Sequence, residues 1–306
     1  MTQHLRPLIH RTPLIQHQYG TWFEGHMRQL RNPANVLRED AVIFHRDVKQ
    51  ALLTGDGYHY HFHHTGEMGD IIAALPIFRH LGGVHLTIGN HPLVGWRKMS
   101  DGGYKTILPL LKKIPCIKSV TWSDHCPPNA FNMAHFRESY KHDQTLTASQ
   151  ADYVGVPHTE LDMSKWIDIK YEGGHPSKSK VPFIAIARSE RYHNPAVNWR
   201  KLVDDVRAQH NKPDALLLGT ATEFLPDVLF FGTAKEFAAM QYIIPEARHC
   251  KTKDFLDLAR KLKYARAFIG NQSGPWWLAR AMGLVTHQET HDYIRDSIVG
   301  GPNAHY

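Results

Sequence analysis

The sequence predicts an α/β protein with two domains, each built on a parallel sheet. Short apolar segments that suit buried strands alternate with amphipathic segments that suit helices, an order typical of parallel sheets. A glycine-containing strand–turn–helix sequence occurs in each half of the chain, at 58–76 and at 266–283. Between them, 173–180 contains glycine, proline, serine and lysine without periodicity, which predicts a linker over 171–180.

Length, composition and charge limit the class of protein. A chain of 306 residues with 42% hydrophobic and 21% charged residues fits two globular domains. Its apolar runs are too short for a membrane span, and no signal sequence is predicted. The cysteines Cys116, Cys126 and Cys250 form no Cys-x-x-Cys pair, so we expect a cytoplasmic protein. The net charge of +7 indicates an acidic partner: a nucleoside diphosphate, an anionic membrane surface or nucleic acid.

The N-terminal half begins with an expected extension over 1–57. The strand predicted at 58–63 alternates aromatic residues with His59, His61 and His63, which would share one face. Three histidines on one face make a metal site conceivable, but no nearby carboxylate or cysteine completes a ligand set. A polar outer face of the strand is therefore the simpler interpretation. No metal requirement is predicted.

A glycine turn and a helix follow this strand over 64–76. Gly66 and Gly69 let the backbone approach a ligand closely, and Asp70 lies at the start of the helix. That position is at the carboxyl end of the first strand, where open α/β sheets bind ligands. Asp70 is therefore either a helix cap or a functional carboxylate. Strands at 84–88 and 117–122 and a helix at 107–113 extend this domain, predicted over 58–170.

The second domain, predicted over 181–285, begins with an apolar strand at 181–187. Arg188, Ser189 and Arg191 follow it, and because guanidinium groups match phosphate oxygens, this loop is either a diphosphate site or a solvated basic loop. A helix is predicted at 199–209 and a strand at 215–218. Glu223, after that strand, is a candidate acceptor of ribose hydroxyls or a helix-start glutamate. Residues 242–244 are predicted to form another strand.

The most informative segment lies near the end of this domain. An amphipathic helix is predicted over 254–265, a strand over 266–269, and a second helix with Ser273 as N-cap and Pro275 in its first turn. A helix N-terminus directly after a strand favours phosphate, because it presents backbone N–H groups and a positive dipole end. The polar and aromatic tail over 286–306 follows, and the family resemblance described next implies that it can cross back onto the first domain.

The two turns together resemble the heptosyltransferase-like, family 9 type glycosyltransferases of the GT-B fold. The first turn carries Gly69-Asp70 and Leu75-Pro76, and the second carries Gly270-Asn271-Gln272-Ser273-Gly274 followed by Leu278-Ala279. The resemblance spans about 60 to 290. It implies two Rossmann-like domains with parallel sheets facing a central cleft, with the acceptor bound by the first domain and a nucleotide-sugar donor by the second.

The resemblance also assigns roles. Asp70 matches the aspartate proposed in the family to deprotonate the acceptor hydroxyl, and Glu67 could share or replace that role. The resemblance implies that the contacts to the donor come from the following residues: Gly69, Arg188, Ser189, Arg191, Glu223, Asn271, Gln272, Ser273, Gly274 and Trp277.

The chain departs from the family pattern at two positions. Gln272 stands where the family usually has aspartate, and Trp277 stands where it has histidine. The first change removes a negative charge beside the expected phosphates, and the second removes an imidazole from the donor contacts. Heptose is therefore not supported as the sugar.

The resemblance, together with these residues, implies an inverting, metal-independent transfer of a sugar from a nucleotide-sugar donor to a hydroxyl group. The acceptor is a glycan such as lipopolysaccharide, or a hydroxylated base in DNA, which a basic chain with aromatic residues could bind. Two other classes stay open: a non-catalytic nucleotide- or nucleic-acid-binding protein on the same scaffold, and a nucleotide-sugar epimerase. The oligomeric state is not predicted.

Overall fold

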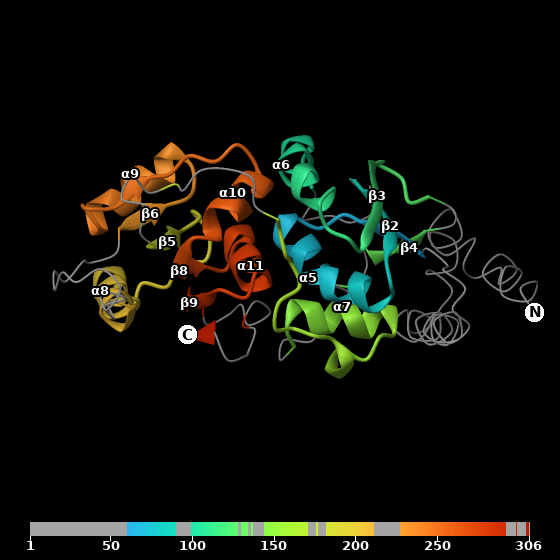
Figure 1. Ribbon diagram of the computed structural model, residues 1–306. Coiled ribbons are helices and arrows are strands. Elements are labelled where there is room, and N and C mark those ends of the chain that lie inside the picture. Colours follow the sequence, from blue (N-terminus) through green and yellow to red (C-terminus); the bar gives the residue numbers. More distant parts are fainter. Residues whose placement is uncertain are drawn as a thin grey trace, which may run out of the picture. The chain divides into compact units, whose positions relative to one another are not determined.

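The computed structural model describes residues 60–89, 99–127, 130–133, 136, 144–170, 176, 182–210, 227–291, 298 and 304–305. The chain forms two compact units, Met1–Met163 and Ser164–Tyr306. Each contains one sheet whose described strands are all parallel, with helices between the strands (Figure 1). The prediction of an α/β protein with two parallel-sheet units is thus confirmed.

The first unit is built on a four-stranded sheet in the order β3-β2-β1-β4. Its strands are β1 (Tyr60–His64), β2 (Val84–Ile88), β3 (Ile117–Trp122) and β4 (Phe131–Asn132). The chain proceeds from β1 through β2 to β3 on one side and then returns to place β4 on the other side of β1. The direction of winding therefore reverses between β1 and β4, and such a switch point is where doubly wound sheets bind ligands.

Helix α5 forms the centre of the first unit. The helices in the described part of this unit are α5 (Met68–His80), α6 (Asp101–Leu111), α7 (Leu146–Val154) and a short 3₁₀ turn at His158–Glu160. Every residue of α5 from Asp70 to Phe78 is buried, and the Thr147 hydroxyl of α7 donates to the Ala73 carbonyl of α5 at 2.9 Å. Phe62 of β1 contacts Phe78 of α5. The first turn of α5 is thus held firmly against the sheet.

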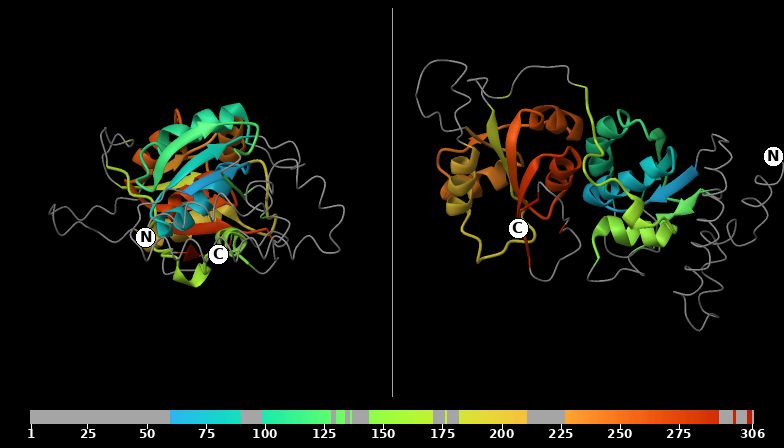
Figure 2. Two further views of the ribbon diagram at one scale, coloured as in Figure 1. Left: turned by 90° about the vertical axis from the view of Figure 1, so that its right-hand side faces the viewer. Right: turned by 60° about the horizontal axis from the view of Figure 1, so that its bottom comes forward.

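The second unit has a six-stranded sheet in the order β10-β9-β8-β5-β6-β7. Its strands are β5 (Phe183–Ala187), β6 (Val228–Phe230), β7 (Arg248–His249), β8 (Ala265–Asn271), β9 (Val285–Glu289) and β10 (Ala304–His305). Strands β5, β8 and β9 lie side by side in Figure 2. The chain runs from β5 to β6 and β7, and then continues at β8 on the other side of β5, so the switch point lies between β5 and β8.

Four helices in the described part of the chain accompany this sheet: α8 (Trp199–His210), α9 (Ala234–Ile243), α10 (Phe255–Leu262) and α11 (Gly274–Ala281). Every residue of β5 is buried, and Ile184 and Ile186, on one face of the strand, lie in one cluster with Trp199, Val203 and Met240. The unit begins with a segment that is fixed to α11, because the N–H groups of Trp166 and Ile167 both donate to the Ala281 carbonyl at 2.9 Å.

Most strands predicted from the sequence are present, and β2 and β3 have the predicted bounds. The strand predicted at 242–244 is wrong, because this segment ends helix α9. A capping box between Thr233 and Glu236 starts that helix, which continues through Ile243, and Tyr242 is 94% exposed on it.

Some predicted features lie outside the described residues: the extension over 1–57, the strand at 215–218 and nearly all of the linker over 171–180. Of the tail over 286–306, the structure describes the end of β9, β10 and a few neighbouring residues. None of the helices in the described part of the chain is long and apolar enough to cross a membrane.

Candidate functional site

The switch point of the second unit brings together the ends of β5 and β8. Ala187, the last residue of β5, pairs with Gly270, and the two strands approach closely here. A Cβ atom at position 270 would lie 3.0 Å from the Ala187 carbonyl oxygen and 2.6 Å from the Phe268 ring. Glycine therefore allows the two strand ends, and the loops that follow them, to lie next to each other.

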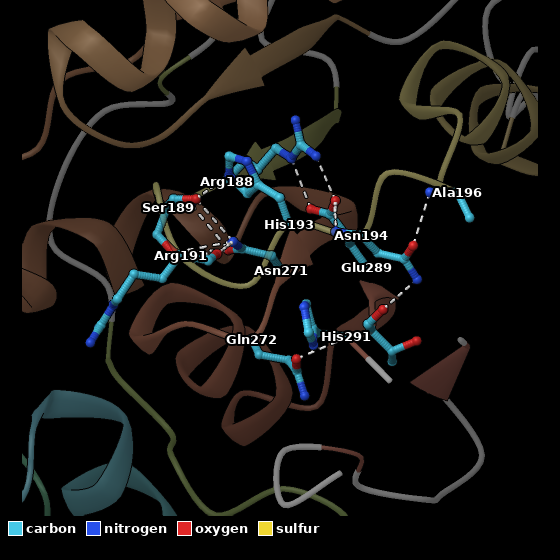
Figure 3. Close-up of polar contacts among 11 residues, drawn as sticks. Arg188, Ser189, Arg191, His193, Asn194, Ala196, Asn271, Gln272, Glu289 and His291 are labelled. Carbon is cyan, nitrogen blue, oxygen red and sulfur yellow. Dashed lines mark hydrogen bonds and ion pairs between the residues drawn. The ribbon is translucent and has the colours of Figure 1, made fainter. Parts of the chain in front are cut away.

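The buried side chain of Asn271 joins the two loops (Figure 3). Its Oδ1 accepts from the Ser189 backbone N–H at 3.0 Å, and its Nδ2 donates to the Ser189 carbonyl at 3.0 Å and to the Arg191 carbonyl. The Ser189 hydroxyl lies within hydrogen-bonding distance of the same amide. One residue at the end of β8 thus fixes the backbone of the loop that follows β5.

These bonds stabilise an unusual backbone. Tyr192 has a φ of 60°, a left-handed conformation that costs a non-glycine residue roughly 1–2 kcal/mol. Asn271 holds the chain immediately before it, and His193 contacts the Ser189 carbonyl at 2.6 Å through Nε2. Figure 3 shows the Arg191 side chain extending away from this cluster, and its guanidinium lies over the Tyr192 ring at 5.5 Å.

Arg188 and Glu289 form a second link, between the ends of β5 and β9. Arg188 donates from Nε to Oε2 at 2.8 Å and from Nη2 to Oε1 at 2.6 Å, a bidentate pair, and its guanidinium lies over Trp199. The Glu289 side chain has no exposed surface. Glu289 Oε1 also accepts from the Asn194 backbone N–H at 2.9 Å. Arg188 was predicted as a phosphate ligand, and in the structure a carboxylate takes two of its donors.

Helix α11 begins at the same place. Ser273 is its N-cap residue with an extended backbone, but its hydroxyl donates to the Asn271 carbonyl at 3.2 Å and does not cap the helix. Gly274 and Pro275 begin the first turn. Proline has no N–H group, so Gly274 and Trp276 supply the N–H groups that have no carbonyl four residues earlier within the helix, whereas the Trp277 N–H donates to the Ser273 carbonyl at 3.1 Å. Gln272 is buried, and its Oε1 accepts from the His291 N–H at 3.1 Å. The N-cap side chain thus leaves the positive dipole end of α11 uncapped.

Trp277 lies in the core of the unit. It is 2% exposed and packs edge-on against Trp276 at 5.4 Å between ring centroids. Its ring is thus part of the buried core around α11. Glu223, the remaining predicted donor contact, lies outside the described residues.

Asp70 and Glu67 lie together at the switch point of the first unit. Glu67 is the N-cap of α5 and Asp70 is its third residue, and the two form a capping box. Asp70 Oδ2 accepts from the Glu67 backbone N–H at 2.9 Å, and the whole residue is 4% exposed. Gly69 belongs to the first turn of the same helix. Both carboxylates therefore stabilise the start of α5, at the end of the sheet where a ligand is expected.

The histidine face of β1 is only partly described. His61 is exposed and stacks on His85 at 4.7 Å, whereas His63 is buried; His59 lies outside the described residues. Among the described residues, no group of three or more histidine, cysteine, aspartate or glutamate side chains is arranged to hold a metal ion.

The structure therefore brings six predicted residues together at the β5–β8 switch point: Arg188, Ser189, Arg191, Asn271, Gln272 and Ser273, with Gly274 next to them. Glu289 and Asn194, which complete this network, were not predicted. The position of Glu289 at this site can be inferred only when the fold is known, because a parallel strand placed after α11 ends at the same edge of the sheet as β5 and β8.

Comparison with known proteins gives two different results. No protein-family model matches the chain, and no curated protein matches it. Solved structures of similar fold include glycosyltransferases. One of them is a family 9 glycosyl transferase and another is a heptosyltransferase, the kinds of enzyme named by the sequence resemblance.

Three of these structures illustrate the likeness. A family 9 glycosyl transferase from Veillonella parvula is 11% identical, over 75% of this chain and 79% of that chain, with a TM-score of 0.48. The E. coli ADP-heptose lipopolysaccharide heptosyltransferase II is 12% identical, over 81% of this chain and 93% of that chain, with a TM-score of 0.43. The iron-containing dodecameric glycosyltransferase TibC from enterotoxigenic E. coli is 17% identical, over 75% of this chain and 59% of that chain, with a TM-score of 0.41.

Proposed function

We propose that this protein is a glycosyltransferase that moves a sugar from a nucleotide-sugar donor to an acceptor hydroxyl. The observation that carries the proposal is the junction formed by Asn271, which fixes the loop after β5 against the uncapped start of α11. The junction lies at the carboxyl ends of parallel strands, at a topological switch point, where doubly wound sheets bind nucleotides.

The diphosphate of the donor would bind against the first turn of α11. Backbone N–H groups and the positive dipole end favour an anion there. The Ser189 hydroxyl would donate to a phosphate oxygen, and the exposed guanidinium of Arg191 would supply a positive charge. Arg188 would contribute mainly by holding the loop, because its pair with Glu289 already occupies Nε and Nη2.

These groups would lower the energy of the transition state as well as bind the donor. During transfer the acceptor oxygen forms a bond to the anomeric carbon while the bond from that carbon to the diphosphate oxygen breaks. Negative charge then grows on the leaving diphosphate, next to fixed N–H groups and a cation. A single displacement of this kind inverts the anomeric centre and needs no metal ion when protein groups stabilise the leaving group.

Asp70 would accept the proton of the attacking hydroxyl. Its carboxylate lies at the carboxyl end of β1, held by the Glu67 N–H, in a buried position that keeps its orientation fixed. Glu67 is half-buried in the same turn and is the second carboxylate available for this role. The acceptor class stays open between a glycan and a hydroxylated base in DNA. The net charge of +7 suits an anionic acceptor of either kind.

A thermal unfolding series tests the donor site first. The protein is heated with UDP, GDP, ADP, CMP or TDP, with and without magnesium. A nucleotide at about 100 times its dissociation constant should stabilise the fold by about 2.7 kcal/mol. We expect one nucleotide to stand out, equally with and without magnesium, and Arg191→Gln to weaken its effect. Arg200→Gln, which changes an exposed arginine on α8, is the matched control.

Transfer is then measured with the matching sugar nucleotide and with glycan and DNA acceptors. Asp70→Asn should lower transfer at least 100-fold, which is within the usual contribution of a general base. Asp101→Asn, an exposed acid in the first turn of α6, is its control. Nucleotide binding without any transfer would favour the non-catalytic class, and conversion of the donor without acceptor would favour the epimerase. The absence of a shift with all five nucleotides would contradict the donor site itself.

A further inference from the structure

His64 lies directly beneath the turn that presents Asp70. It is the last residue of β1, and none of its surface is exposed. Its Nδ1 accepts a hydrogen bond from the Gly66 backbone N–H at 2.9 Å. Since an acceptor nitrogen carries no proton, the imidazole in this arrangement is neutral, with its hydrogen on Nε2.

The His64 ring and the Asp70 side chain both pack against Gly66. A Cβ atom at position 66 would lie 2.6 Å from His64 Cε1, 2.5 Å from Asp70 Cβ and 2.7 Å from Asp70 Oδ2. Real side chains do not approach so closely, so glycine is required for both neighbours to keep their places. The next N–H in the chain, that of Glu67, donates to Asp70 Oδ2 at 2.9 Å. Two successive N–H groups of the turn are thus held by His64 and by Asp70.

Buried groups of the same unit lie around His64 and its turn. The Asp70 carbonyl accepts from the buried Gln150 amide of α7 at 3.1 Å, and the Phe136 ring lies 6.1 Å from the imidazole. On the neighbouring strand β2, Ile88 is paired with His64. In the described part of this strand and turn, the other titratable residues are Tyr60, His61, His63, Glu67 and Asp70.

We propose that His64 is a positioning residue for Asp70, and that only its neutral form holds the turn. This rests on the proposed role of Asp70. Protonation of Nδ1 turns the acceptor into a donor, which then faces the Gly66 N–H, also a donor. The bond that fixes the turn is therefore present while Nδ1 is unprotonated and is lost when Nδ1 carries a proton.

The direct test is NMR of the whole chain with ¹⁵N-labelled histidine, which needs no substrate. At pH 8 the long-range imidazole spectrum should show His64 with its proton on Nε2 and an unprotonated Nδ1. Amide hydrogen exchange of Gly66 should be at least 10-fold slower in the wild type than in His64→Leu. His64→Asn, whose Oδ1 can occupy the position of Nδ1, should restore most of this protection. His158→Asn, an exposed histidine in the same unit, is the control.

The outcomes separate this proposal from the proposed function. A proton on Nδ1 at pH 8, or Gly66 exchange that is equally fast in wild type and His64→Leu, would overturn the role of His64 whether or not the protein transfers sugar. If His64→Leu does not fold, the imidazole spectrum of the wild type still decides the question, because a proton on Nδ1 would exclude the bond to Gly66. If transfer is found, His64→Leu should lower kcat about 10-fold with little change in the KM for the donor, and His64→Asn should recover most of it.

Discussion

Replacing Glu289 by glutamine removes the negative charge that Arg188 faces, while the shape of the side chain is kept. The Glu289 carboxylate has no exposed surface, and it accepts three hydrogen bonds: two from Arg188, at 2.8 and 2.6 Å, and one from the Asn194 N–H at 2.9 Å. In Glu289→Gln the amide oxygen can keep one or two of these bonds. The amide NH₂ group then faces a donor, and the guanidinium keeps a charge with no buried counter-charge.

The magnitude follows from burial. Removing one partner of a buried ion pair costs about 3–5 kcal/mol. Arg188 is 17% exposed, so water offsets part of its loss, and we expect Glu289→Gln to destabilise the second unit by about 3 kcal/mol. Arg188→Gln leaves the fully buried carboxylate without a cation and should cost about 4 kcal/mol. The double variant has no buried charge and should cost about 4 kcal/mol, so the coupling between the two residues is about 3 kcal/mol.

Amide hydrogen exchange in β5 and β8 measures this loss, because these core strands exchange only when the unit opens. The control is the exposed pair of Arg200 and Asp204, 47% and 48% exposed, whose loss should destabilise the unit far less because water screens both charges. A coupling below about 0.5 kcal/mol, or a Glu289→Gln effect as small as that of the control, would refute the view that this pair fixes the loop after β5.

Three further predictions concern the same unit. Arg191→Gln should weaken nucleotide binding about 10-fold, measured by calorimetry, and should change the free energy of unfolding by less than about 0.5 kcal/mol, because the side chain is exposed. Burial, together with nearby His305 and His210, lowers the pKa of His287 to about 4. In the unfolded chain the pKa of histidine is about 6.5, so the contribution of His287 to stability is fully present above pH 6.5 and decreases as the pH falls towards 4. Between pH 7 and pH 5 the free energy of unfolding should fall by about 2 kcal/mol for this reason. Urea unfolding should show that this decrease is absent in His287→Asn. Gly270→Ala should destabilise the unit by about 1–3 kcal/mol in the same assay, since its Cβ meets a backbone oxygen at 3.0 Å, whereas Gly102→Ala, with nothing nearer than 3.9 Å, should not destabilise the first unit.

Much of the fold could be predicted because its signals are local. The apolar runs at 84–88 and 117–122 gave β2 and β3 with their observed bounds. The apolar face formed by Phe255, Leu258 and Leu262 predicted helix α10, and all three residues are buried in the structure. Ser273 was predicted as the N-cap of α11 and is the N-cap, although its hydroxyl bonds to Asn271 instead of the helix.

The partners in the site could not be predicted in the same way, because they depend on strand order. Glu289 lies far along the chain from Arg188, and nothing in Val285-Thr286-His287-Gln288-Glu289 has the apolar alternation of a typical strand. Only the position of β9 beside β8 brings the carboxylate to the end of β5. Similarly, the basic residues at 188–191 suggested two phosphate ligands, and the structure shows that one of them is already paired.

The incorrect strand at 242–244 has a local cause. Tyr242, Ile243 and Ile244 have high strand propensity, but the capping box at Thr233 starts a helix that continues through Ile243. The strand propensity of these three residues was therefore too weak to end a helix that is capped nine residues earlier.

The proposed function depends above all on a nucleoside diphosphate binding at the junction of β5, β8 and α11. Hydrogen–deuterium exchange of the full chain, with and without the nucleotide that gives the largest thermal shift, locates the bound nucleotide. We expect protection to appear in 188–194 and in the first turn of α11, and Asn271→Ala to remove it. Binding that protects other segments and leaves these two unchanged would place the nucleotide elsewhere and rule out this site.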